Sequence, residues 1–339
     1  MKNTKIYKFL IGPRPVLRFR VLVQWGMLLW CVLLGIQLAL FVRHFESGGS
    51  LPYFPRFPGV EAFLPIGALV SLKNWLANGQ VDAVHPAALA LFLTFVAMSV
   101  LTRKSFCSWL CPVGTLEELM WKLGQRIFGR LWHPWGWLDR LLQSLKYLLL
   151  IFFVKIILID MPAAALKGFL AAPYWAVSDI KMLHFFTGLG GIPLLTIGLL
   201  IVLSLFFRNP WCRYLCPYGA LLGVLSVFSP SRIRRDSQVC VDCGTCSQVC
   251  PARLPVATKN QILSPECTGC LTCVENCPQP DALDMALLSQ PLPKWVFPVL
   301  VLALFSFGVA GGMLSGHWQT SLTYTDYQRL IPLIPLLSH

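Results

Sequence analysis

The chain has 339 residues, of which 56% are hydrophobic and only 13% are charged, and its mean hydropathy is +0.64. Soluble domains carry about 25% charged residues, so this composition excludes an ordinary soluble protein and predicts a chain surrounded largely by lipid. The formal net charge is +13. Membrane proteins concentrate lysine and arginine in cytoplasmic loops, and this bias explains the charge better than a nucleic-acid partner, so we expect no nucleic-acid binding.

Five apolar runs, each long enough to cross a bilayer core of about 30 Å, follow one another along the chain. They cover residues 21–42, 85–102, 143–163, 189–207 and 295–315. With the N-terminus inside, 20 of the 28 lysines and arginines fall on cytoplasmic segments and 6 on outer segments. This charge bias predicts a cytoplasmic N-terminus and, after five spans, a C-terminus on the outer side.

Lys155 is the outstanding polar residue inside the third run. A charge within a membrane helix indicates a functional site by default. Two structural explanations carry the same weight: Lys155 pairs with Asp160, or its side chain extends to the outer surface.

The chain contains an internal repeat with an offset of 105 residues. The segment Arg103–Gly114, RKSFCSWLCPVG, matches Arg208–Gly219, RNPWCRYLCPYG. Each repeat would consist of an outward span, an outer loop, an inward span and a cysteine motif, so the two repeats run parallel. Parallel repeats are related by an axis along the membrane normal, which would bring the two motifs face to face near the inner surface.

Residues 236–290 form a polar segment that carries the strongest motif, C-x2-C-x2-C-x3-C-P, in two copies. In this pattern three thiolates of one copy hold a 4Fe-4S cluster, and the fourth cysteine ligates the other cluster. The spacing therefore predicts two 4Fe-4S clusters rather than zinc. One cluster is assigned to Cys240, Cys243, Cys246 and Cys277. The other is assigned to Cys267, Cys270, Cys273 and Cys250. Gly244 and Gly269 suit loops that turn tightly and aim N–H groups at sulfur.

Four further cysteines stand in C-x3-C-P motifs: Cys107, Cys111, Cys212 and Cys216. Proline disfavours helix at the preceding residue and is favoured at the first helical position. We therefore expect a break at each motif and new helices over 112–128 and 217–228, whose N-termini favour thiolate charge. Two interpretations stay open. The four thiols hold an additional iron or iron–sulfur site, which the ligand count favours, or they form a redox-active or structural set.

The outer loops are apolar and aromatic with few charges. They either lie flat at the membrane interface or form the wall of a pocket for a quinone head group. Four polar groups would serve such a pocket: Glu61, Lys73, Asp179 and Lys181. Haem is not supported, since there is no C-x-x-C-H motif and no histidine lies in the middle of a span.

The two C-x3-C-P motifs followed by a two-cluster segment resemble the NapH/NosR family of polytopic membrane 4Fe-4S electron-transfer proteins. The stretches PGVEAFLPIGALVSLK and KSFCSWLCPVGTL are similar to its YccM-like branch. The resemblance covers residues 20–315 and includes the twelve motif cysteines. It implies the bacterial inner membrane, exchange with the quinone pool, and a protein redox partner, either a periplasmic or membrane cytochrome or a reductase.

These observations predict an α-helical membrane protein with about five transmembrane helices, arranged as two parallel two-span repeats plus one. A small cytoplasmic α+β domain of the bacterial two-cluster ferredoxin type would be inserted before the last helix. The predicted parts are the basic cytoplasmic N-terminus (1–20), the first repeat (21–125), the second repeat (126–230), the ferredoxin-like domain (231–292), and the last helix with its periplasmic tail (293–339).

The predicted function is electron transfer between the quinone pool and a redox partner, either as a quinol dehydrogenase component or as a non-enzymatic carrier. The alternative is a metal-reducing assembly factor or a redox-sensing membrane protein without steady turnover.

Overall fold

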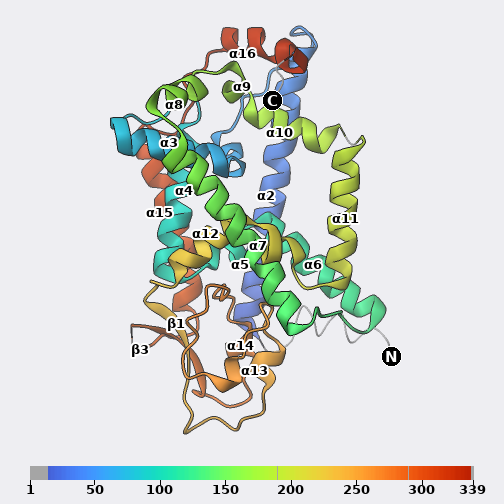
Figure 1. Cartoon of the computed structure of the whole chain (residues 1–339), viewed down its shortest axis with the longest axis vertical. Helices are drawn as coiled ribbons and strands as arrows, with labels where there is room; N and C mark the ends of the chain where they lie inside the picture. The colour runs from blue at the N-terminus through green and yellow to red at the C-terminus, as the bar shows by residue number, and fades with distance from the viewer. Residues whose placement is uncertain (1–13, 189, 289, 337–339) are drawn as a thin grey trace. The chain divides into compact units, whose positions relative to one another are not determined.

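The structure is a computed structural model that describes residues 14–188, 190–288 and 290–336 (Figure 1). The first 13 positions of the predicted basic N-terminus and the last three residues lie outside this range. Five apolar helices coincide with the five predicted runs. They are α2 (Pro15–Glu46), α4 (Pro86–Thr102), α7 (Gly136–Val154), α11 (Ile192–Phe206) and α15 (Val296–Leu314).

Three of these helices are long and apolar enough to cross a membrane. They are α2, α15, and α7 together with the π-helix Lys155–Asp160 that continues it. The bent pair of α10 (Ser178–Thr187) and α11 qualifies as a fourth if it is counted as one span. Helix α4 is equally apolar but has only 17 residues. The chain is thus a helical membrane protein, and its five-span arrangement stays a prediction.

Shorter helices connect the long ones. They are α3 (Pro65–Asn78), α5 (Ser105–Trp109), α6 (Pro112–Phe128), α8 (Ala163–Leu170), α9 (Pro173–Ala176), α12 (Pro217–Ser226), α13 (Thr245–Gln248), α14 (Thr272–Glu275) and α16 (Tyr324–Leu330). Proline occupies the start of several of them because the first helical N–H has no intrahelical partner to lose. The helices predicted after the two C-x3-C-P motifs are confirmed as α6 and α12, although α12 ends two residues earlier than expected.

The chain forms two compact units. The first contains the residues up to 28 together with 95–147 and 200–305, and therefore holds both C-x3-C-P motifs and the ferredoxin-like segment. The second contains residues 29–94, 148–199 and the residues from 306 on, and therefore holds the predicted outer loops. The boundary between them falls inside α2, α4, α7, α11 and α15.

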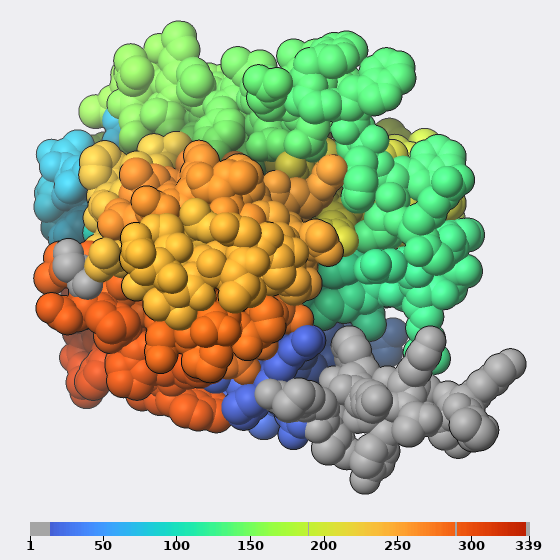
Figure 2. Space-filling model, turned by 90° about the horizontal axis from the view of Figure 1, so that it is seen from below, coloured from blue at the N-terminus to red at the C-terminus, as the bar shows by residue number. Residues whose placement is uncertain are grey.

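A small antiparallel sheet with the strand order β1-β2-β3 closes the ferredoxin-like segment of the first unit. Strand β1 (Ser231–Arg235) pairs along its whole length with β2 (Leu283–Leu287), which also pairs with β3 (Gln290–Pro291). Since β1 precedes and β2 follows the cysteine motifs, their pairing holds the ends of this segment together. Figure 2 shows the segment from below as the gold and orange surface. The arrangement has the α+β character expected of a ferredoxin-like domain.

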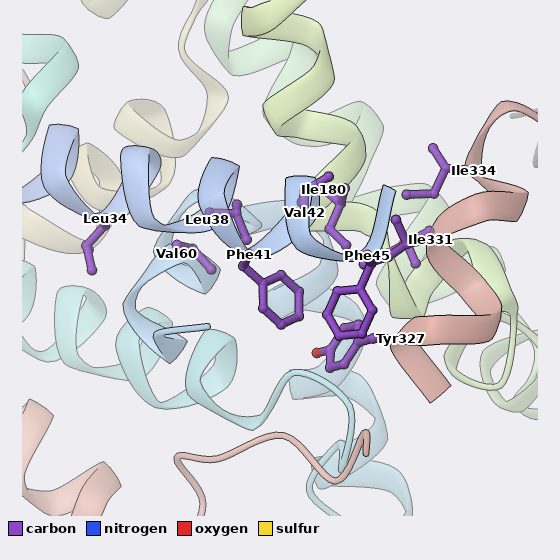
Figure 3. Close-up of a cluster of buried hydrophobic side chains, with 11 residues drawn as sticks. Leu34, Leu38, Phe41, Val42, Phe45, Val60, Ile180, Tyr327, Ile331 and Ile334 are labelled. Atoms are coloured by element: carbon purple, nitrogen blue, oxygen red, sulfur yellow. The ribbon is translucent and has the colours of Figure 1, made fainter. Parts of the chain in front are cut away.

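The second unit has an aromatic core around the C-terminal half of α2 (Figure 3). Phe41 and Phe45 pack edge to face, with ring centroids 5.0 Å apart, and Tyr327 of α16 lies 5.0 Å from Phe41. Such pairs add about 0.5–1.5 kcal/mol to the energy of burial. The other members of the core are Leu34, Leu38, Val42, Val60, Val177, Ile180, Ile331 and Ile334.

Candidate iron–sulfur sites

Each set of four cysteines predicted to hold a cluster lines a cavity of its own. The first cavity is lined by Cys240, Cys243, Cys246 and Cys277. The second is lined by Cys250, Cys267, Cys270 and Cys273. Each set includes one cysteine from the other motif, as the spacing predicts. Four thiol sulfurs are the donor set that a 4Fe-4S cluster takes, so the residues fit this cofactor.

The backbone of both motifs turns at the same two positions. The third and fifth residues of each motif have left-handed backbone: Asp242 and Gly244 in the first, Gly269 and Leu271 in the second. Glycine adopts this conformation without steric cost and occurs once in each motif, at different positions. The tight turns expected at Gly244 and Gly269 are thus confirmed, and they extend to Asp242 and Leu271, which the sequence did not single out.

The two C-x3-C-P motifs interrupt their helices before the proline, as predicted. Cys111 and Cys216 have extended backbone and immediately precede α6 and α12. Cys107 lies in α5, and Cys212 lies in a π-helix (Trp211–Leu215). The N–H of Gly219 donates to Sγ of Cys216 at 3.2 Å, so the N-terminus of α12 points at this thiol.

The four thiols of these motifs are partly buried and lie near one another. Burial raises the pKa of Cys111, and the charges of Cys107 and Cys216 raise it further. Burial also raises the pKa of Cys107 to about 11, although the nearby Lys104 opposes this shift. Buried thiols that disfavour one another's ionisation become thiolates when a cation compensates them, and metal binding supplies this compensation. Within the described residues, no three His, Cys, Asp or Glu side chains meet as ligands of a single metal ion.

A third cavity joins the two kinds of cysteine site. Cys107 and Cys212 of the C-x3-C-P motifs line it together with Cys270. Cys270 also lines the second cavity of the ferredoxin-like segment. The wall also includes four cations and two carboxylates: Arg20, Lys104, Arg208, Arg213, Glu118 and Glu266. The excess of positive charge favours anionic sulfur ligands in this cavity.

The first C-x3-C-P repeat holds the chain that leads into the second cysteine motif. The Arg103 side chain is fully buried and donates to the carbonyl oxygens of Ile262 (3.0 Å) and Ser264 (2.8 Å). Ser108 Oγ donates to the carbonyl oxygen of Thr268 at 2.7 Å.

The second repeat holds a different part of the ferredoxin-like segment. Arg208, which corresponds to Arg103 in the repeat, donates to the carbonyl oxygens of Gln248 and Cys250 at 3.4 Å each. Arg213 donates to the carbonyl oxygen of Ala252 at 2.8 Å. Each repeat therefore positions the backbone of one end of one cysteine motif.

A buried ion cluster connects α7 with the second cysteine motif. Lys146 Nζ donates to both carboxylate oxygens of Glu266, at 2.6 and 2.7 Å, and the Tyr147 hydroxyl donates to the same carboxylate at 2.7 Å. Lys104 Nζ lies 3.9 Å from it. Burial pushes the pKa of Glu266 upward, but Lys104 and Lys146 outweigh it and lower the pKa. The sequence analysis did not predict that Lys104 and Glu266 belong to this ion cluster. The one feature that could have indicated it was their position near the cysteines of the motifs.

The N-terminal part of α2 also contacts the site. Arg20 Nη2 donates to Glu118 Oε1 at 2.6 Å, and Gln24 Nε2 donates to Glu118 Oε2 and to the carbonyl oxygen of Ser108, both at 3.0 Å. Sequence analysis assigned Arg20 only to the basic segment. Its partner Glu118 on α6 lies 98 residues further along the chain, so only the packing of the folded chain brings the two side chains together.

In the second unit, the outer-loop charges have partners within the protein. Arg56 donates to Asp179 (2.6 Å) and to Glu61 (2.8 Å), and all three side chains are nearly fully buried. Lys73 donates to the carbonyl oxygen of Ile157 at 2.9 Å. Lys181 lies over the Tyr174 ring, 4.6 Å from its centroid. A quinone pocket in these loops stays an untested prediction.

Lys155 pairs with Asp160 through a contact of 2.6 Å, and both side chains are exposed. Of the three explanations that the sequence offered for Lys155, the structure favours pairing.

Both kinds of cysteine motif match families of 4Fe-4S proteins. Residues 84–130 and 189–235, which contain the C-x3-C-P motifs, match the family described as "4Fe-4S binding domain". Residues 232–278, which contain both ferredoxin-like motifs, match the "4Fe-4S dicluster domain". No solved structure matches the chain.

Three individual relatives extend this similarity. The "Putative electron transport protein YccM" of Escherichia coli is 42% identical, over 96% of this chain and 93% of that protein. The "Ferredoxin-type protein NapH" of Escherichia coli is 28% identical, over 62% of this chain and 70% of that protein. The "Regulatory protein NosR" of Pseudomonas aeruginosa is 29% identical, over 55% of this chain and 25% of that protein.

A helical membrane chain with cysteine-lined cavities and three matches to 4Fe-4S domains defines a membrane iron–sulfur protein of the electron-transfer class. Within this class, the chain belongs to the NapH/NosR-type family of 4Fe-4S proteins, in its YccM-like branch. The resemblance carried by the sequence motifs is thereby confirmed.

Proposed function

We propose that this protein is a quinol dehydrogenase component that passes electrons from the quinone pool, through its iron–sulfur sites, to a protein redox partner. The third cavity carries this proposal, because Cys270 belongs both to it and to the second cavity of the ferredoxin-like segment. A series of adjoining cysteine sites thus leads from the C-x3-C-P motifs into that segment. In such a relay the protein fixes the spacing of the redox groups and tunes their potentials.

The eight cysteines of the ferredoxin-like segment would hold two 4Fe-4S clusters in the two sets that line the first and second cavities. These clusters supply reversible one-electron acceptance when bound. The chain contributes donors to the sulfurs: Arg235 Nη1 lies 3.4 Å from Cys240 Sγ, and the N–H of Leu254 lies 3.5 Å from Cys250 Sγ. Hydrogen bonds to sulfur favour the more negative, reduced form of a cluster and therefore raise its potential. Cys243 is exposed, which gives the first site a side that a partner protein can approach.

The four C-x3-C-P cysteines would hold an additional iron–sulfur site. Three observations support it: the thiols lie near one another, Lys104 lies beside them, and both motifs match a 4Fe-4S binding family. Iron and acid-labile sulfide analysis tests it. We expect about twelve iron atoms per chain for three 4Fe-4S clusters, against about eight for two. Cys107→Ser should remove iron from this site alone, whereas Cys31→Ser, in an apolar stretch of α2, should retain all of it.

The topology proposed for this function has the N-terminus and the ferredoxin-like segment in the cytoplasm and the C-terminus in the periplasm of a bacterial inner membrane. The charge bias of the connecting segments supports this orientation.

Rapid mixing of a quinol with the purified, oxidised protein tests the function. If the proposal holds, quinol bleaches the iron–sulfur absorbance during the mixing experiment. A chemical reductant added afterwards then bleaches it no further. Clusters that a chemical reductant reduces but quinol does not would contradict the proposal. That outcome would favour a redox-sensing or assembly role.

A further inference from the structure

An apolar cavity of about 500 Å³ lies in the first unit, apart from the three cysteine-lined cavities. Tryptophan, leucine, phenylalanine and proline side chains from residues 132–145 and 200–215 make up most of its wall. Pockets for small organic ligands typically have about 300–1,000 Å³ and mainly apolar walls with a few placed polar groups. The size and lining therefore suit one flat, apolar ring system.

Two titratable side chains, His133 and Tyr214, interrupt the apolar wall. The Tyr214 hydroxyl donates to Oδ1 of Asp139 at 2.7 Å. Arg213 binds both oxygens of the same carboxylate, at 3.0 and 2.6 Å, and Gln143 donates to it at 2.8 Å. Asp139 thus fixes the direction in which the Tyr214 hydroxyl donates, so the hydroxyl oxygen can accept a hydrogen bond from a ligand.

The cavity adjoins the second C-x3-C-P motif. Tyr214 stands two residues from Cys212 and two from Cys216, and Pro210 and Leu215 also line the cavity. Cys212 in turn lines the third cavity, which reaches Cys270. A ligand in the apolar cavity would therefore lie beside the first cysteines of the proposed relay.

Part of the cavity wall belongs to a candidate membrane span. This span is α7, and the neighbouring Leu141 side chain on that helix is 59% exposed. Trp132 and Trp135, both exposed, stand before the start of α7, where aromatic side chains are typical of the membrane interface. These positions suit a lipid-soluble ligand.

We propose that this cavity binds the head group of a quinol, with Tyr214 hydrogen-bonded to a ring hydroxyl and Trp132 and Trp135 against the ring. This assignment rests on the proposed function and specifies where its substrate binds. It assigns the quinol site to the first unit and not to the outer loops of the second unit, where Glu61 and Asp179 are paired with Arg56.

Oxidation of the bound quinol breaks two O–H bonds and yields the quinone, two protons and two electrons. Both protons pass to water, and His133, a titratable side chain of the wall, can accept one of them on the way. The electrons leave one at a time to oxidised iron–sulfur clusters of the chain. No bond forms between substrate and protein.

Photoaffinity labelling tests the site independently of turnover. The holoprotein in lipid nanodiscs is illuminated with an azidoquinone, and the labelled peptides are mapped by mass spectrometry. We expect label within residues 132–145 and 200–215, and we expect unlabelled quinone to compete for it. Label confined to other segments, or label that quinone does not displace, would overturn the assignment; the latter result would identify adventitious apolar binding.

Leu142→Trp fills the cavity and should reduce both the displaceable label and the rate of quinol-driven cluster reduction by about tenfold or more. Leu141→Trp is the matched control, because Leu141 neighbours Leu142 but does not line the cavity. Iron content and reduction by dithionite should remain at the wild-type level in both variants. If Leu142→Trp fails to fold, Leu203→Phe on α11 tests the same wall. A filled cavity with normal labelling and normal quinol oxidation would contradict the proposal.

The outcomes separate this inference from the function on which it rests. If quinol reduces the wild-type clusters but the label maps elsewhere, the function stands and the site is wrong. If quinol does not reduce the clusters but displaces label from this cavity, the site stands and the function is wrong. Tyr214→Phe should weaken competition by quinol for the label while retaining iron, and unchanged competition by quinol would remove Tyr214 from the site.

Discussion

Gly114 and Gly219 occupy the same position in the two repeats, but their surroundings differ. A Cβ atom added at Gly114 would collide with the backbone carbonyl oxygen of Cys107. A Cβ atom at Gly219 would lie 3.5 Å from Cys216 Sγ and from Lys104 Nζ, which are ordinary contacts. A backbone atom cannot move aside as a flexible side chain can, so the two positions should respond differently to the same substitution.

We therefore predict that Gly114→Ala lowers the free energy of unfolding by about 1–3 kcal/mol and reduces iron at the C-x3-C-P site. Gly219→Ala should behave like wild type, since alanine is also the better helix former. Thermal unfolding in detergent and iron analysis measure both effects. Equal losses in the two variants would show that the collision with the Cys107 carbonyl oxygen is not the cause.

Glu118 gives the stability of the first unit a dependence on pH. Burial pushes the pKa of Glu118 upward, but Arg20 and Lys122 outweigh it and lower the pKa from 4.5 to about 2. A carboxylate with a depressed pKa stabilises the folded state above its unfolded pKa. Its contribution is therefore complete above about pH 4.5 and is lost as the pH falls toward 2.

From this shift, Glu118→Gln should cost about 3 kcal/mol at neutral pH, and the difference from wild type should shrink between pH 4.5 and 2. Thermal unfolding of both proteins across pH 6 to 3 measures this convergence. Glu46→Gln, at a carboxylate whose side chain is 49% exposed, serves as the control and should show almost no effect. A constant difference between wild type and Glu118→Gln at all pH values would refute the prediction.

At the scale of elements, the repeated arginines decide how the ferredoxin-like segment is held. Arg103 is fully buried and donates to three carbonyl oxygens, those of Ser226, Ile262 and Ser264. Arg208 makes two longer contacts of 3.4 Å and lies over the Trp121 ring, 5.2 Å from its centroid. Removing a buried donor leaves its acceptors unsatisfied, at about 1–3 kcal/mol each.

Arg103→Met should therefore open residues 236–282 to proteolysis and reduce the iron content, with a loss of at least about 3 kcal/mol. Arg208→Met should have the same kind of effect at a smaller magnitude. Limited proteolysis followed by mass spectrometry measures the opening, and Arg103→Lys, which keeps one donor group, should be intermediate. Greater damage from Arg208→Met than from Arg103→Met would reverse the assignment.

The element boundaries were largely predictable. The five apolar runs and the prolines at 112 and 217 set where the helices begin, because hydrophobic length and the missing proline N–H act locally. The π-helix at Trp211–Leu215 was not predictable. There, the carboxylate of Glu117 on α6 accepts from the backbone N–H groups of Trp211 and Cys212, at 2.7 and 3.1 Å, and this contact comes from a distant part of the chain.

At the scale of the whole molecule, reporter fusions test the five-span topology that the charge bias predicts. The five-span prediction places residue 130 in the cytoplasm, whereas a helix α4 that does not cross the membrane would place it outside. We expect a green fluorescent protein fused after Arg130 to fluoresce and alkaline phosphatase at the same position to be inactive. Fusions after Gly49 and Gly316, both predicted outside, should give the opposite pattern. An active phosphatase at Arg130 would remove α4 from the spans.

The sequence by itself determined the class of the protein, its apolar helices and the breaks at the C-x3-C-P motifs. It also predicted the two crosswise sets of cysteines, each of which lines one cavity. These features depend on local spacing and on composition, which the printed chain contains. Only the tertiary structure decided which charges meet these sites. Lys104 beside the thiols of Cys212 and Cys216, the Arg20–Glu118 pair, and the Tyr214–Asp139 pair beside an apolar cavity join segments separated by 75 to 112 residues. Burial and proximity fix such contacts, and neither quantity is a property of a short stretch of sequence.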